Sequence, residues 1–474
     1  MWQALVWKES RDLLMSSRFA ATFGVTALLI LLTFYAAARN HQLAVTHYQA
    51  SQAENERQLA GLTDWLALEQ YRVFLPPSPL EALVTGVSSD IGRTAEVRAR
   101  GEIAPEDSRF NEDPVFAVFR YLDLGFIFQV VLSLFAILLG YDAVCGEKER
   151  GTLRLTFANA VPRATYITAK LAGSLLTLGA ALLSAMLAGC LLLPALGVHL
   201  HGEEWLRLGL ILLSGLLYFS AFLGISVFVS TLTHRSSSAF LAMLVIWIGA
   251  ALVVPSSAVI LAGRAVAVPS VDELNSQKAS FARGLFRDFA DAMKSFKTPE
   301  GTDPQDVQVL MGAFQKFSDS LSTERNEKLK AFNGRLNEDR RNRQRVQERF
   351  ALGLARVSPT ASLTLSMAAL AGTSLELKNR FYDEAEAYRT RFNDFIRDKT
   401  GVNVGGSMMV WRTTDDDGEA PKAVDASELP AFTYRQAGFA DSLSQAGFDL
   451  ALLAVFNLLF FMGAFAAFLR YDVR

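Results

Sequence analysis

Apolar positions along this chain gather into long charge-free runs, and the charged positions gather between them. A helical span needs about 20 mostly apolar residues, because hydrocarbon offers no partner for an unpaired backbone amide. The helices of a soluble core would carry charges on their outer faces every turn or two, and these runs do not. The pattern therefore predicts an all-α membrane protein. Its six transmembrane helices are expected at 19–38, 121–141, 168–198, 206–233, 236–263 and 447–470.

The first run also has the basic flank of a cleavable signal peptide, since Lys8 and Arg18 precede it. Its apolar part is longer than the roughly 7–15 residues of a signal sequence, and Glu9 lies in the flank. We expect an uncleaved first span, preceded by an amphipathic helix at 1–18.

Lysine and arginine residues in short loops indicate the orientation, because they stay on the cytoplasmic side. They gather on the side that holds both termini, whereas the short loop on the opposite side has only Arg207 at its edge. Both termini and the loop at 142–167 are therefore expected in the cytoplasm. The long polar segments 39–120 and 264–446 are expected outside, where they form a mostly helical domain, with long helices and minor β structure in 264–446.

Within the second polar segment, apolar residues at three- and four-residue steps predict a helix with one apolar stripe, formed by Leu310, Phe314, Phe317 and Leu321. The mixed charges at 324–349 are typical of a solvated helical face or a long hairpin arm. Pro359 is expected to end this helix, because proline disfavours helical geometry in the residue before it.

Residues 360–372 are uncharged but too short to cross a bilayer, so they lie at the membrane surface or cap the domain as a buried helix. Thr373 and Glu376 fit a capping box that opens an aromatic-faced helix. A short hairpin is expected at 408–414. In the first polar segment, 42–71 is expected to be helical. Pro255 is expected to kink or end the fifth span.

The charge balance excludes nucleic acid as a partner. The 46 Lys and Arg residues and 48 Asp and Glu residues leave a formal net charge of −2, so no basic field attracts a polyanion. The mean hydropathy of +0.23 excludes a disordered chain. The two cysteines lie in or beside apolar runs, so they form no disulfide framework for the polar segments.

The sequence offers no catalytic site and no cofactor. The nearest approach to a phosphate-binding loop, at 86–94, has one residue too many and Arg93 in place of lysine. His199 and His201 lie near two glutamates, but further ligands are missing nearby, so a solvated loop is expected rather than a metal site. The spans hold few ionisable groups, which argues against a proton-coupled pump and against an intramembrane enzyme.

The most informative stretch is the loop between the second and third spans. It runs Glu147-Lys148-Glu149-Arg150-Gly151-Thr152-Leu153, then Pro162-Arg163, then Lys170-Leu171. A charged turn followed by a short amphipathic segment just beneath the membrane is suited to docking in a groove on a cytosolic partner. Glu147, Glu149 and Arg150 would fix its register by charge-assisted hydrogen bonds.

This stretch resembles the signature of type 2 ABC transporter permeases, in which Glu-x-Glu followed by Gly-Thr-Leu introduces the coupling helix. The segment before the first span is similar to the connecting helix of that family. The resemblance implies a non-catalytic permease that dimerises with itself or a related permease. It also implies two separate cytosolic ATPase subunits, which hydrolyse ATP. It assigns the contact with them to Glu147, Lys148, Glu149, Arg150, Gly151, Thr152 and Arg163.

The large segment between the fifth and sixth spans is similar to a subgroup of these permeases found in bacterial export or surface-assembly systems. The similarity implies a bacterial inner-membrane location and an extracytoplasmic partner protein. An exporter, or a complex that transmits force to its outer domain, is the function expected. A membrane-anchored receptor or surface-assembly scaffold without transport activity is the alternative.

Overall fold

The computed structural model describes residues 1–60, 70–98, 104–105, 123–159, 161–297, 307–400 and 428–471, with single positions at 62, 65, 68 and 425. The hairpin expected at 408–414 lies outside the described residues. Within them, six helices are long and apolar enough to cross a membrane, and the chain is an all-α membrane protein. These six are Ser17–Ala60, Leu124–Glu149, Arg163–Ala195, Gly202–Leu232, Ser236–Ala265 and Phe439–Arg470.

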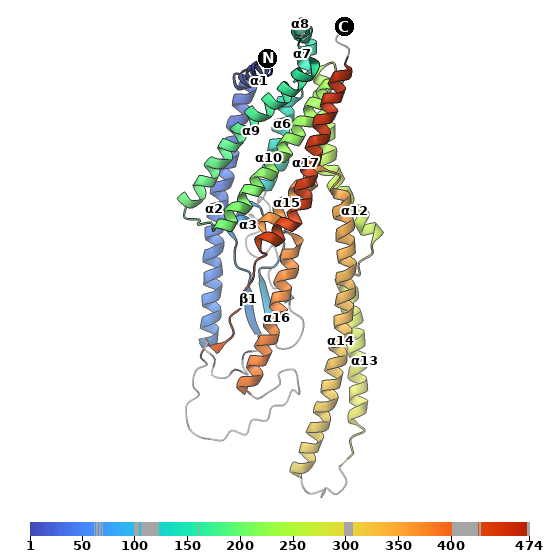
Figure 1. The fold of residues 1–474 in the computed structure, drawn as a ribbon. Helices are drawn as coiled ribbons and strands as arrows, with labels where there is room; N and C mark the ends of the chain where they lie inside the picture. Colours follow the sequence, from blue (N-terminus) through green and yellow to red (C-terminus); the bar gives the residue numbers. More distant parts are fainter. Residues whose placement is uncertain are drawn as a thin grey trace.

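The third, fourth and sixth spans are single α-helices. The first span is the first half of a longer helix, and π-helical segments interrupt the second and fifth spans. Helix α10 (Gly202–Leu232) packs against α9 (Arg163–Ala195), α17 (Phe439–Arg470) and the second span. Both chain termini lie at one end of the bundle, which we call the terminal end; the opposite end is the distal end (Figure 1). The short helix α1 (Trp2–Leu14) lies at the terminal end.

The first span is half of a longer rod. Helix α2 (Ser17–Ala60) continues without a break beyond the apolar run and projects past the distal end (Figure 1). The prediction that helix extends to residue 71 is wrong, because Tyr71 lies in strand β1 (Gln70–Phe74). The Asn55 side-chain amide donates to the Arg72 carbonyl at 2.6 Å and fastens this strand to the rod.

The two polar segments fold together at the distal end. Strands β1, β2 (Thr94–Arg98) and β3 (Ala104–Pro105) form an antiparallel sheet in that order, and β1 pairs with β2 from Gln70↔Arg98 to Phe74↔Thr94. Helix α16 (Leu375–Thr400) covers the sheet through its aromatic face. Their common core contains Leu59, Val73, Leu75, Ala95, Val97, Phe381, Ala385, Tyr388, Phe392, Ile396 and Leu429. We call this unit the distal domain; the short helix α3 (Pro79–Leu83) joins it to the bundle.

A second distal feature is a long helical hairpin, the arm, made of α13 (Val271–Met293) and α14 (Val307–Ala355). Aromatic contacts hold its helices together, such as Phe281 stacked on Phe332 with ring centroids 3.9 Å apart. Figure 1 shows the arm beside the distal domain and pointing away from the bundle. The hairpin-arm interpretation of the mixed-charge run is therefore confirmed.

Helix α15 (Pro359–Ala371) is the uncharged segment, and it is buried, but among the spans of the bundle and not as a cap on the distal domain. It packs between α10 and α17 at the distal end. The capping-box prediction at Thr373 is wrong. The Thr373 amide instead closes the end of α15 by donating to the Ala368 carbonyl at 2.9 Å, and its buried hydroxyl has no hydrogen-bond partner.

The interrupted spans contain π-helical segments, η2 (Ile127–Leu132) between α5 (Leu124–Phe126) and α6 (Ser133–Gly140), and η3 (Gly249–Val253) between α11 (Ser236–Ile248) and α12 (Val254–Ala265). Pro255 lacks an N–H for the Ala251 carbonyl, and the Gln129 side chain donates to that carbonyl instead at 3.4 Å. Pro255 thus marks an irregularity and does not end the span.

Close packing in the bundle can be tested at two glycines of α10. A Cβ at Gly215 would lie 2.3 Å from the buried Phe128 ring, whereas a Cβ at Gly209 would meet nothing within 4 Å. Gly215→Ala should destabilise the protein by about 1–3 kcal/mol through overpacking, measured as thermal unfolding in detergent. Gly209→Ala is the matched control and should leave stability unchanged or slightly raised. Equal effects of both substitutions would contradict the packing.

Candidate functional site

The end of the second span and the loop after it form a compact elbow, residues 141–163, at the terminal end. It consists of two short helices, α7 (Cys145–Glu149) and α8 (Thr152–Ala158). Gly151 joins them with a φ of +72°, in the left-handed region that glycine enters without strain. The chain therefore turns sharply here and places α8 beyond the terminal ends of the spans (Figure 1).

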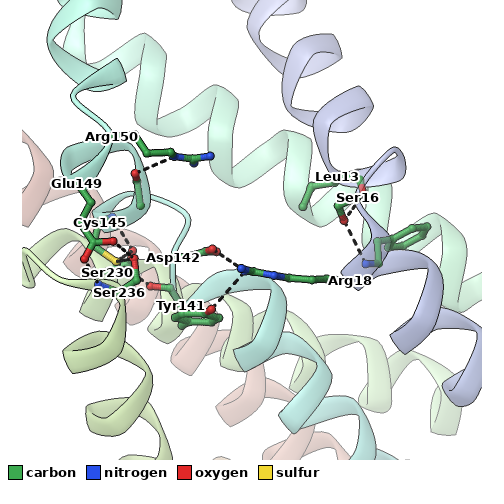
Figure 2. Close-up of polar contacts among 12 residues, drawn as sticks. Leu13, Ser16, Arg18, Tyr141, Asp142, Cys145, Glu149, Arg150, Ser230 and Ser236 are labelled. Atoms are coloured by element: carbon green, nitrogen blue, oxygen red, sulfur yellow. Dashed lines mark hydrogen bonds and ion pairs between the residues drawn. The ribbon is translucent and has the colours of Figure 1, made fainter.

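Helix α7 and the residue before it form hydrogen bonds with the end of α10 and the start of α11. The Ser230 hydroxyl accepts the backbone N–H groups of Val144 and Cys145, both at 3.0 Å. Lys148 donates to two carbonyls at the end of α10, including Thr233 at 3.0 Å. Glu149 accepts the Ser236 amide at 3.0 Å and its hydroxyl at 2.6 Å, as Figure 2 shows.

These contacts match the electrostatics of helix ends. The last carbonyls of a helix have no intrahelical partner and carry partial negative charge, and the first N–H groups carry partial positive charge. Lys148 therefore stabilises the end of α10, and Glu149 stabilises the start of α11. Two adjacent residues of opposite charge hold two consecutive spans in place.

Two further arginines join the elbow to the first and last spans. Arg18 at the start of α2 pairs with Asp142 at 2.7 Å and donates to the Tyr141 hydroxyl at 3.2 Å (Figure 2). Arg163 donates to the Leu469 carbonyl at the end of α17 at 3.1 Å. The second contact repeats the pairing of a cation with a helix C-terminus.

The most buried charge of the site is Lys170 on α9, whose side chain is 6% exposed. Its ammonium lies 2.8 Å from a Glu147 carboxylate oxygen and 3.1 Å from one of Glu9 on α1. Tyr166 donates a hydrogen bond to the second oxygen of Glu147. This cluster joins α1, α7 and α9, and Gly173 lets α1 approach, since a Cβ there would lie 3.0 Å from Glu9.

Below these polar contacts, the elbow has an apolar side. Leu153 is buried in a cluster with Tyr166 and Phe468, whose rings stack with centroids 5.2 Å apart. Phe157 of α8 packs against both rings. The elbow therefore contacts α9 and α17 through apolar side chains as well as polar ones.

The seven predicted interface residues all lie in or beside this elbow, but most of them make contacts within the chain. Glu147, Lys148, Glu149 and Arg163 hold helices of the bundle, as described above. Arg150 donates to the Gly146 carbonyl at 3.0 Å, and Thr152 donates to that of Glu147 at 3.3 Å. Their contact with another subunit stays a prediction.

Several members of the site were missed by sequence reasoning. These are Glu9, Arg18, Asp142, Ser230 and Ser236. Glu9 is 161 positions from its partner, and a hydroxyl near a helix end has many roles, so their positions in the sequence gave no usable signal. For Arg18, the one indication in the sequence was that basic residues recur at the cytoplasmic ends of the expected spans.

The outward side of the elbow borders a shallow open groove, lined by Lys148, Glu149, Arg150, Gly151, Leu153, Arg154, His234 and Tyr471. Cations outnumber carboxylates in this lining. Beside it, Leu155 of α8 is 69% exposed. A charged groove next to an exposed apolar side chain is suited to a protein partner with an acidic rim.

Among the described residues, no group of three or more His, Cys, Asp and Glu side chains is placed to hold a metal ion. The histidine pair is exposed in the loop just before α10, where His201 is the N-cap residue of the helix. There the His201 amide donates to Glu204 at 2.8 Å, which caps the helix.

Six apolar helices whose terminal ends are joined by one polar elbow define a multi-pass membrane protein of the permease class. The family model described as "ABC-2 family transporter protein" matches residues 3–473, and the chain belongs to this family. It is therefore a type 2 ABC permease, the membrane subunit of an ABC transporter. A comparison with curated proteins found no match.

The buried cluster generates a stability prediction. Lys170→Met should destabilise the protein by about 3–5 kcal/mol, because Glu9 and Glu147 would then be buried without a counter-ion. Lys8→Met, at an exposed lysine of α1, is the control and should change stability by less than about 1 kcal/mol. Thermal unfolding of the purified protein in detergent measures both.

The triple variant Glu9→Gln, Glu147→Gln and Lys170→Met removes all three charges and should recover much of the loss. If the triple variant were no more stable than Lys170→Met alone, unpaired charge would not be the cause.

Proposed function

We propose that this permease is an exporter, or a force-transmitting complex, driven by separate ATP-binding subunits that dock on the elbow. The observation that carries the proposal is the set of contacts made by one short loop with helices of all five other spans. These contacts reach α2, α9, α10, α11 and α17. A displacement of the elbow would therefore act on every span at once.

The docking surface in this proposal is the outward side of α8. Its exposed Leu155 would enter an apolar pocket of the ATPase subunit, and the cationic groove around Arg150 would face acidic residues there. The terminal end of the bundle would accordingly lie in the cytoplasm of a bacterial cell and the distal domain outside the inner membrane. A second copy, or a related permease, would complete the transporter.

The chain would supply no ATP chemistry of its own. ATP binding would draw two ATPase subunits together, and each elbow would move with the subunit docked on it. Such coupling requires two states with different contacts. Single hydrogen bonds at helix ends, such as those of Glu149, can be exchanged at low cost between two such states.

The alternative is a membrane-anchored scaffold, for which the arm is the supporting observation. Met311 and Phe314, near the tip of the arm, are 64% and 40% exposed, far from the bundle. A scaffold would bind an outer partner there and would retain no ATPase subunit. Purification of the wild-type chain from its native membrane, followed by a test for ATP hydrolysis in the complex, separates the two functions.

Docking can be tested at α8. Leu155→Glu should weaken binding of the ATPase subunit at least about tenfold, because a carboxylate would replace a central apolar contact. Co-purification at graded salt and detergent measures it. Leu375→Glu is the matched control, since Leu375 is also exposed but lies on α16 of the distal domain. Wild-type binding by Leu155→Glu would refute docking on α8.

Transmission can be tested separately at Glu149 and its partner. Glu149→Gln and Ser236→Ala each remove part of the cap on α11, worth about 1 kcal/mol. Both should at least halve the nucleotide-driven distance change at the distal end, and Ser236→Ala should do so with ATPase binding intact, because Ser236 does not line the docking groove. Spin labels on Leu206→Cys and Leu443→Cys, both exposed, report that distance, since both native cysteines are buried. A full distance change in both variants would exclude this route.

A further inference from the structure

The base of the arm lies beside a membrane-spanning helix. The Gln347 side chain on α14 donates to the Val266 carbonyl just beyond α12, at 2.9 Å, and Gln347 is also the nearest side chain to Gly263. Figure 1 shows α12 and this part of α14 side by side. Because α12 is the distal part of the fifth span, Gln347 marks the depth at which that span ends.

From this depth toward the bundle, α14 exposes large apolar side chains. Val346 and Phe350 are 54% and 45% exposed and lie about 40° apart around the helix axis, and Val357, just beyond the end of α14, is 70% exposed. The adjacent α12 exposes Val259, Ile260 and Leu261 at 52–65%. These two apolar surfaces lie at the same depth, and on α12 the surface belongs to a membrane span. The last turns of α14 therefore extend into the hydrocarbon region.

Three exposed arginines lie where these apolar surfaces end. Arg345 and Arg349 are two residues on either side of Gln347, about 3 Å along the axis in each direction, and Arg264 follows Gly263. None of the three has an ion pair or hydrogen bond with any residue that the structure describes.

The neighbouring arginines of the arm differ in this respect. Arg340 donates to the Pro269 carbonyl at 3.1 Å, and Arg343 pairs with Asp339 at 2.9 Å. Arg341 lies 3.7 Å from Asp383 of the distal domain. Partners within the chain are thus available to these three arginines, whereas the three cations at the membrane boundary have none among the described residues.

We propose that Arg264, Arg345 and Arg349 bind the phosphate groups of anionic phospholipids in the leaflet at the distal end. Guanidinium groups match phosphate oxygens in a bidentate geometry, and a cation at the edge of an apolar surface extends toward the headgroups. Phe350 and Val346 beside them contact the acyl chains. These three arginines fix the base of the arm on the membrane, and they do so independently of the ATPase subunits.

The first test measures depth. Phe350→Cys, labelled with an environment-sensitive dye in reconstituted vesicles, should be quenched strongly by lipids that carry a nitroxide on the acyl chain. Ala331→Cys, also exposed but about 28 Å farther out along α14, should not be quenched. The two native cysteines are buried and do not compete for the dye. Equal quenching at both sites would overturn the proposal.

The second test measures the headgroup. In nanodiscs of equal parts phosphatidylcholine and phosphatidylglycerol, the wild-type chain should retain phosphatidylglycerol enriched about two-fold or more on extraction. The double variant Arg345→Gln and Arg349→Gln should lose this enrichment. The control double variant, Arg287→Gln and Arg335→Gln, removes two exposed arginines elsewhere on the arm and should keep it.

Soluble glycerol phosphate should leave the enrichment unchanged, because the acyl chains contribute to binding. Displacement by glycerol phosphate, or the same enrichment in all three proteins, would show that the arginines form no lipid site. Neither result bears on whether an ATPase subunit docks at the elbow.

Discussion

The arrangement of the spans depends on charged side chains that bind the ends of helices. In a bilayer, apolar helices gain little from burying apolar surface against each other, so polar contacts and close packing decide how they associate. The elbow supplies such contacts at the terminal end, where Lys148, Glu149 and Arg163 each hold a helix terminus. Most of their partners are backbone groups, which every helix end leaves unpaired. The elbow thus positions five spans with very few side chains.

Helix α10 connects this terminal end with the distal end. Its Ser230 holds the elbow, and in its middle the Tyr218 hydroxyl bonds the Gln129 carbonyl of η2 and Thr360 of α15, both at 3.1 Å. At its distal start, Arg207 donates to the Ala437 carbonyl before α17. A shift of α10 would therefore disturb the π-helical segment, the buried helix and the last span together. This continuity is what a transporter needs if an event at one end is to open a path at the other.

The spans could be predicted from the sequence because the bilayer imposes one strong rule, an apolar run of sufficient length. The distal sheet could not, since β1 and β2 are five residues each and their pairing depends on α16, which follows about 300 positions later. The motif in the sequence located the elbow, but it did not predict which groups the charged side chains of the elbow bind. From the sequence, Glu147 was expected to contact another subunit. In the structure it forms an ion pair with Lys170, which also binds Glu9. Contacts of such long range leave no local pattern.

The polar contacts at the terminal end differ in how much free energy is needed to break them. Helices α1, α7 and α9 share the buried Lys170 cluster, and breaking such a cluster costs about 3–5 kcal/mol. The polar contacts with α10, α11 and α17 are caps and single hydrogen bonds, each worth about 0.5–2 kcal/mol, and Phe468 of α17 also packs against Tyr166 and Phe157. The ion pair between Arg18 and Asp142 is partly exposed and contributes at most about 1 kcal/mol. A force on the elbow would thus move α1, α7 and α9 as one body, and the first contacts to break would be the polar ones with α10, α11 and α17.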